Sequence, residues 1–340
     1  MRAPAIAPLE ETGSLGILHL KRFWSQTLAA TAARPPESES DPSRDHTLLC
    51  GIHAGVHEAI AFIQRNSPTF EQFESWVLEI NGGSLDPARV AHLNAALAGL
   101  TPPGHPPAPG SPEAPFSAED LAHWREHGYV ILHDAISPAQ CHLTAQAIYH
   151  FLAVDPAKPD TWYSNPAGHS IWVPLLRHPA FLANRQAPRI HAAFSQLWGR
   201  TDLWPTVDQG GFNPPERPGW PFPGPHLHWD TSIATPVPLG IQGILYLTDT
   251  AADQGAFQCV PGFHHRLESW LAQLPEGVNP RDHALMKTLP AIPIPGRAGD
   301  LVIWHHALPH GASPNRSTRP RVAQYLTLRP GRTVIQPVWR

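Results

Sequence analysis

Residues 226–230 read HLHWD, and the predicted fold and function both start from this stretch. In an extended strand alternate side chains point the same way, so His226, His228 and Asp230 are expected to share one face. Two imidazoles and one carboxylate form the ligand set of a non-haem Fe(II) site that leaves further positions open. His228 and Asp230 are therefore the predicted metal ligands on this strand, and a remote histidine must complete the set.

The remote ligand is sought in residues 299–328, GDLVIWHHALPHGASPNRSTRPRVAQYLTL. Three histidines are candidates: His305, His306 and His310. His310 is preferred because it borders the turn that returns the chain through Arg321, so that both side chains can face one cavity from neighbouring strands. One alternative stays open here, since His226, His228 and His310 together would form a three-histidine set of the kind that suits zinc.

Arg321 is the predicted partner of an acidic cosubstrate. An iron bound by one carboxylate and by a dianionic 2-oxo acid carries excess negative charge, which is costly to bury unless it is paired. A guanidinium can pair with a carboxylate through two parallel hydrogen bonds. Arg319 is the alternative. Gln209 and Asn213 are predicted to lie on one face of a strand and to hydrogen-bond the same cosubstrate.

Composition indicates a globular intracellular protein. The 340 residues are 42% hydrophobic and 15% charged, with a formal net charge of -4 and no basic cluster for nucleic acid or an anionic membrane. The three cysteines are far apart, which argues against a disulfide framework and favours a reducing cytoplasm. Glu10 and Glu11 interrupt any signal peptide, and no run is long enough to span a bilayer. We expect a cytoplasmic protein that acts on a small molecule.

Three regions are predicted along the chain. Residues 1–100 are expected to form a helical region, with helices near 15–30, 46–64, 68–80 and 86–100, that offers a surface for a protein partner or for self-association. Residues 101–115, TPPGHPPAPGSPEAP, are expected to be a proline-rich linker. Residues 116–340 are the predicted catalytic domain.

Residues 116–340 are predicted to be mainly β with flanking helices. Ser117 is expected to cap a short helix that ends at Gly128, and another helix is expected to start at Ser137. Many short strands separated by proline and glycine turns favour a double-sheet jelly roll of the cupin kind. The strands are expected at 129–132, 204–213, 226–231, 239–248, 256–260, 300–304 and 322–328.

Four stretches together resemble the phytanoyl-CoA dioxygenase family of Fe(II)/2-oxoglutarate oxygenases. They are FSAEDLAHWREHGYVIL (116–132), HWD (228–230), QGAFQCVPGFH (254–264) and GDLVIWHHALPHGASPNRSTRPR (299–321). The resemblance implies a jelly-roll core, Fe(II) on His228, Asp230 and His310, 2-oxoglutarate paired to Arg321, and O2 as the oxidant. It also implies a hydroxylase that decarboxylates 2-oxoglutarate to succinate.

Two rival interpretations remain at this point. One is a cupin-like metal enzyme that does not use 2-oxoglutarate, and the other is a non-catalytic jelly-roll module that binds a small acid. The carboxylate of Asp230 favours hydroxylation or desaturation over halogenation, because related halogenases carry a small residue in its place.

Overall fold

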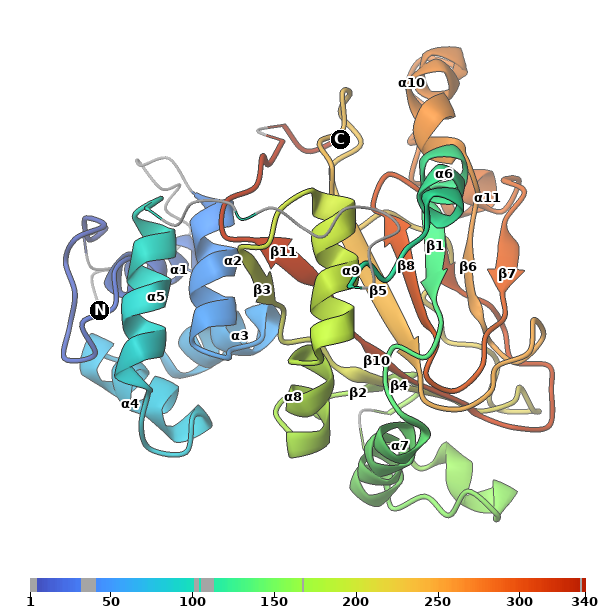
Figure 1. The fold of residues 1–340 in the computed structure, drawn as a ribbon, viewed down its shortest axis with the longest axis horizontal. Coiled ribbons are helices and arrows are strands. Elements are labelled where there is room, and N and C mark those ends of the chain that lie inside the picture. Colours follow the sequence, from blue (N-terminus) through green and yellow to red (C-terminus); the bar gives the residue numbers. More distant parts are fainter. Residues whose placement is uncertain (1–4, 32–40, 101–103, 105–112, 167, 337) are drawn as a thin grey trace. The chain divides into compact units, whose positions relative to one another are not determined.

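The computed structural model describes residues 5–31, 41–100, 104, 113–166, 168–336 and 338–340, so most of the predicted linker lies outside the described residues. The chain divides into two compact units, which are described separately (Figure 1). The helical unit comprises residues 1–105, 200–207 and 328–335, and the sheet unit comprises residues 106–199, 208–327 and 336–340. No helix among the described residues is long and apolar enough to cross a membrane.

The helical unit is built from five helices around one apolar core. The helices are α1 (Leu20–Thr31), α2 (Pro42–Gly51), α3 (Val56–Asn66), α4 (Phe70–Ile80) and α5 (Pro87–Leu97). Asp86 caps α5, where it accepts a hydrogen bond from the backbone of Ala88, and Pro87 occupies the first turn. The predicted single helix over residues 46–64 is wrong. It is two helices, because the chain turns at His53, whose φ of 53° is left-handed, and starts again at Gly55.

Two distant segments of the chain complete the helical unit. Strands β3 (Leu203–Pro205) and β11 (Leu328–Pro330) pair antiparallel as a two-stranded sheet. Trp204 of β3 is 5% exposed and belongs to the same core as Leu48 and Leu93. The predicted strand over residues 204–213 is therefore broken, since its first half lies in the helical unit and its second half in the sheet unit.

The sheet unit contains a six-stranded antiparallel sheet in the order β1-β8-β5-β10-β4-β2 (Figure 1). Its strands are β1 (Tyr129–Leu132), β2 (Trp172–Val173), β4 (Gly210–Asn213), β5 (Ile241–Tyr246), β8 (Leu301–His305) and β10 (Arg321–Tyr325). A second, three-stranded antiparallel sheet has the order β7-β6-β9. Its strands are β6 (Phe257–Cys259), β7 (Ile292–Ile294) and β9 (His310–Ala312).

The two sheets share one apolar core. Phe257 of the small sheet stacks on Trp304 of the large sheet with ring centroids 4.3 Å apart, and Ile244 and Ala323 join the same cluster. The hydroxyl of Tyr246 donates to the Ile294 carbonyl across the core. The inner faces of both sheets therefore meet, and whatever projects from them is shielded from water.

Helices flank these sheets: α6 (Ala118–His127), α7 (Pro138–Leu152), the 3-10 helix η1 (Pro159–Tyr163), α8 (Pro179–Arg185), α9 (Pro188–Trp198), α10 (Phe263–Gln273) and α11 (His283–Met286). As predicted, Ser117 caps α6, Gly128 ends it in the left-handed conformation, and Ser137 caps α7. Phe194 of α9 packs so closely on Gly243 of β5 that a β-carbon there would lie 3.2 Å from its ring. Among the described residues helical residues outnumber strand residues, so the prediction "mainly β" describes only the core of the sheet unit.

Candidate active site

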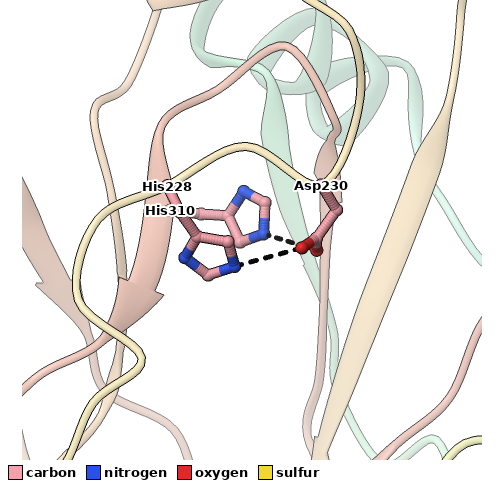
Figure 2. Close-up of side chains that lie close together, drawn as sticks. All are labelled: His228, Asp230 and His310. Atoms are coloured by element: carbon pink, nitrogen blue, oxygen red, sulfur yellow. Dashed lines mark hydrogen bonds and ion pairs between the residues drawn. The ribbon is translucent and has the colours of Figure 1, made fainter. Parts of the chain in front are cut away.

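Three side chains from distant parts of the chain converge at the end of the small sheet. His228, Asp230 and His310 place one potential ligand atom each within 4.8 Å of one another (Figure 2). Asp230 Oδ1 lies 3.2 Å from His228 Nε2, and Asp230 Oδ2 lies 3.2 Å from His310 Nε2. His310 is supplied by β9, and an isolated antiparallel bridge pairs it with His228. Backbone pairing thus brings the two imidazoles together.

The orientation of both imidazoles is fixed from behind. His228 Nδ1 donates to the His226 carbonyl at 2.7 Å, and His310 Nδ1 donates to the Leu308 carbonyl at 3.0 Å. A histidine that donates through Nδ1 keeps the lone pair of Nε2 free for a metal. Both Nε2 atoms point at the carboxylate of Asp230 (Figure 2) and hydrogen-bond it through a proton that a bound metal would replace. The donor set therefore has the chemistry that Fe(II) requires.

The charges within this cluster support each other. Burial alone would raise the pKa of Asp230, but hydrogen bonds from His228 and His310 outweigh it and hold the pKa well below its ordinary value. Burial would lower the pKa of His228, and its contact with Asp230 reverses that direction, so that the net shift is upward. The side chain of Asp230 is 52% exposed, so the cluster is accessible from solvent.

Arg321 is the largest fully buried side chain of the described residues, with 0% exposure. None of its guanidinium nitrogens has a hydrogen-bond partner within the described part of the chain. Because it lies two residues from Ala323 on β10, Arg321 points to the same inner face as that core residue. A β-carbon on Gly211, across the sheet, would lie 3.4 Å from the guanidinium, so a glycine there leaves it room. An unpaired buried cation of this kind calls for an anionic ligand.

The other predicted cosubstrate residues, Asn213 and Gln209, lie on or beside the strand next to Arg321 and make contacts within the protein. Asn213 stands opposite Arg321 in the strand register, and its amide donates to the Ser313 carbonyl at 3.3 Å. Gln209 precedes β4, and its backbone carbonyl accepts a hydrogen bond from the backbone N–H of Tyr325. The alternative arginine, Arg319, is exposed in the loop before β10. Their roles toward a cosubstrate stay predictions.

The competing histidines lie elsewhere. The ring of His226 lies 4.5 Å from that of His283 and lines a separate cavity of about 250 Å³ with Gln258 and Lys287. His305 accepts a hydrogen bond from its own loop, and His306 contacts the Pro238 carbonyl. Within the described residues, only the group around Asp230 meets the spacing of a metal site.

The predicted strand over residues 226–231 is wrong, and a residue that the sequence did not reveal explains the difference. Only His228 forms a bridge in this segment. The carbonyls of Trp229 and Thr231, which would bond to a neighbouring strand, accept from the guanidinium of Arg281 instead. A second unforeseen residue is Gln242 of β5, whose amide contacts Asp230. No motif marks either residue, because each is placed by tertiary packing.

Comparison with known proteins identifies the relatives of this chain. A model of the phytanoyl-CoA dioxygenase family matches residues 124–323. A Dictyostelium discoideum protein that carries the phytanoyl-CoA dioxygenase name is 24% identical over 262 residues, which cover 62% of this chain and 75% of that protein. The matched region contains all three residues of the metal cluster and Arg321.

Similar solved structures include a non-haem α-ketoglutarate-dependent enzyme and a protein solved with 2-oxoglutarate. A non-haem α-ketoglutarate-dependent carbocyclase, SnoK, from nogalamycin biosynthesis is 21% identical, with a TM-score of 0.46 over 68% of this chain and 90% of that chain. EctD from S. alaskensis, solved with 2-oxoglutarate and 5-hydroxyectoine, is 21% identical, with a TM-score of 0.46 over 68% of this chain and 81% of that chain. The family assignment comes from the sequence match and not from these structures.

Proposed function

This chain belongs to the phytanoyl-CoA dioxygenase family, and from this premise we propose that it is an oxygenase that hydroxylates a small organic metabolite. Enzymes of this family use Fe(II), 2-oxoglutarate and O2. The observation that carries the proposal is the pairing of a two-histidine, one-carboxylate cluster with a buried guanidinium that has no protein partner. The first is a site for the metal, and the second is a site for the acid that binds beside it.

We infer that the two sheets are the halves of a jelly roll. Their strands are antiparallel, their inner faces share one core, and Arg321 and His310 are buried. Closure of two sheets around a core is the usual way in which such folds protect their edges and enclose a ligand. The arrangement accounts for how residues 228 and 321, far apart in sequence, serve one site.

Each residue of the site has a distinct task. His228, Asp230 and His310 would hold the metal, and Arg321 would pair with a carboxylate of 2-oxoglutarate. When bound, Fe(II) and 2-oxoglutarate would together reduce O2 to an oxidant, and 2-oxoglutarate would be converted to succinate and CO2. The carboxylate of Asp230 occupies the position that related halogenases leave free for chloride, which favours hydroxylation or desaturation.

Aromatic side chains line the inner face near Arg321 and favour a substrate with apolar surface. Trp172 of β2 packs on Tyr325 of β10 with ring centroids 4.7 Å apart, and Tyr325 shares the face of Arg321. Tyr163, the last residue of η1, and Trp220 also pack together, with ring centroids 5.6 Å apart. Residence in the cytoplasm, and a partner or self-association surface on residues 1–100, stay predictions.

The proposal is tested by anaerobic titration of the apoprotein with Fe(II) and then with 2-oxoglutarate. Chelation of Fe(II) by a 2-oxo acid gives a weak visible charge-transfer band. We expect the band in the wild type, strongly weakened Fe(II) binding in Asp230→Ala, and retained Fe(II) binding without the band in Arg321→Ala. Arg319→Ala, the exposed arginine two residues away, is the matched control and should behave as the wild type.

Two outcomes would contradict the proposal. Wild-type protein that binds iron or zinc but gives no band with 2-oxoglutarate would favour the cupin-like enzyme. Wild-type protein that binds 2-oxoglutarate without any metal would favour the acid-binding module.

A further inference from the structure

Gln242 makes a hydrogen bond that is directed at one oxygen of the metal-binding carboxylate. It lies on β5 opposite Trp304 of β8, so its side chain projects to the inner face with that tryptophan. Gln242 Nε2 lies 2.7 Å from Asp230 Oδ2. An ionised carboxylate only accepts hydrogen bonds, so the amide must turn its NH2 group toward Asp230 and its oxygen away.

This orientation leaves a polar atom in an unfavourable place. Gln242 Oε1 is buried and has no hydrogen-bond partner among the described residues. A buried acceptor without a partner costs free energy, whereas an apolar side chain of the same shape would not. In the apoprotein this cost offsets what the hydrogen bond to Asp230 contributes, so stability is a weak reason for a glutamine at this position. The reason is to be found at the other end of the amide, in the contact with Asp230.

We propose that Gln242 is a positioning residue that sets the rotation of the Asp230 carboxylate for metal binding. This inference rests on the proposed function, because it assigns Gln242 to the same metal site. Asp230 Oδ2 is held by Gln242 and faces His310, whereas Asp230 Oδ1 faces His228 and receives nothing from Gln242. The amide therefore distinguishes two oxygens that are chemically equivalent.

The distinction matters for how many positions the carboxylate takes. A carboxylate that rotates freely can offer both oxygens to a cation and so occupy two coordination positions. A carboxylate with one oxygen engaged by a neutral donor offers the other oxygen to the metal. Gln242 would thus keep Asp230 to a single position and leave the remaining ones for the cosubstrate and O2. Donors behind metal ligands commonly change metal affinity by about 10-fold to 100-fold.

The test replaces Gln242 with methionine, which has a similar length and shape but cannot donate. We expect Gln242→Met to weaken the Kd for Fe(II) by about 10-fold or more. We also expect the melting temperature of its apoprotein to stay close to that of the wild type, because the lost hydrogen bond to Asp230 and the removal of the unpaired Oε1 offset each other. A merely structural glutamine would give the opposite pair of results, with a lower melting temperature and an unchanged Kd.

Gln324→Met is the matched control. Gln324 is a fully buried glutamine of the same sheet whose side chain bonds to Asn184 and to the Phe181 carbonyl, away from the metal cluster. This control should lose thermal stability and keep its Fe(II) affinity. In an Asp230→Ala background, Gln242→Met should change the residual Fe(II) Kd by less than about twofold, because the partner of the amide is absent.

The results separate the two proposals. If the wild type binds Fe(II) and gives the 2-oxoglutarate band but Gln242→Met binds Fe(II) within twofold of it, the positioning role is overturned and the proposed function stands. An equal loss of affinity in Gln242→Met with and without Asp230 also overturns it. If the wild type binds no Fe(II), both proposals fail.

Discussion

At the scale of single residues, Arg321 trades stability for function. A buried cation without a partner destabilises the apoprotein, and unsatisfied buried polar groups cost about 1–3 kcal/mol each, with charged groups at the upper end. Tyr246 lies on the same inner face, and burial strongly raises the pKa of its hydroxyl. The hydroxyl therefore stays neutral and does not neutralise the guanidinium. The anion must come from a ligand.

Replacement of Arg321 by methionine should therefore raise stability and remove cosubstrate binding. We expect the apoprotein of Arg321→Met to unfold at a free energy roughly 1–3 kcal/mol higher than the wild type. The Kd for 2-oxoglutarate should weaken by about 100-fold, since a bidentate charged contact is lost. Denaturant unfolding and the band titration measure the two effects, with Arg319→Met as the exposed control. Lower stability in Arg321→Met would mean that a protein group pairs with the guanidinium.

The residue types of the site were predictable from the sequence, and their supporting contacts were not. His228, Asp230, His310 and Arg321 stand in an order and spacing that chemistry can interpret, and the structure brings the three candidate ligands together. Gln242 has no such signal in the sequence, because its contact with Asp230 depends on which segment β5 faces across the core. Asn213 is a different case. Its place on a strand could be predicted from the sequence, but the direction of its amide could not, since the amide donates to the Ser313 carbonyl.

At the scale of elements, the segment that carries Asp230 is held in place by one arginine. The guanidinium of Arg281 donates to the carbonyls of Trp229 and Thr231, on either side of Asp230, and to the carbonyl of Arg340. It also lies over the ring of Trp339, 4.8 Å from its centroid. A planar fork with several donors makes these contacts at once, and an ammonium group does not.

Substitution of Arg281 by lysine tests this clamp. The charge stays, but the fork that reaches several carbonyls is lost. We expect Arg281→Lys to lower the free energy of unfolding by roughly 1–3 kcal/mol and to weaken Fe(II) binding about tenfold, because the backbone that carries Asp230 loosens. Arg266→Lys is the control, since Arg266 is exposed and lies over Phe263 at 5.6 Å. Equal effects of the two substitutions, measured by urea unfolding and Fe(II) titration, would argue against a clamp.

Capped helices were the best predicted elements and irregular segments the worst. Ser117 and Gly128 mark their helix because a cap is a local hydrogen bond that depends on neighbouring residues alone. The segment 226–231 alternates like a strand, yet its carbonyls bond to a side chain from residue 281. The periodicity of a segment indicates which of its faces is buried. It does not indicate which groups pair with its backbone N–H and C=O groups.

At the scale of the whole molecule, the boundary between the units is not a single point in the sequence. The predicted catalytic region 116–340 contributes residues 200–207 and 328–335 to the helical unit, where Trp204 enters the core and β3 pairs with β11. Composition suggested a boundary at the proline-rich segment, since prolines disfavour regular structure. Chain segments that return to an earlier unit carry no such mark, so sequence reasoning missed them.

Each unit contains one histidine whose pKa is lowered to about 3, which should make folding sensitive to acid. Burial, together with the positive charge of Arg329, lowers the pKa of His46 to about 3 in the helical unit. Burial and three neighbouring histidines lower the pKa of His305 to about 3 in the sheet unit. In the unfolded chain a histidine titrates near 6.5. Stability is therefore complete above pH ~6.5 and falls as the pH drops toward ~3, because only the unfolded chain takes up the proton.

At about pH 5 this uptake should cost roughly 2 kcal/mol for each histidine relative to neutral pH. We expect His46→Asn and His305→Asn each to remove that share of the pH dependence, because asparagine does not titrate. Urea unfolding at about pH 7.5 and about pH 5 measures the difference, and the double variant should lose both shares because neither histidine is among the groups that shift the pKa of the other. A double variant that destabilises between the two pH values as much as the wild type would show that other groups govern the acid response.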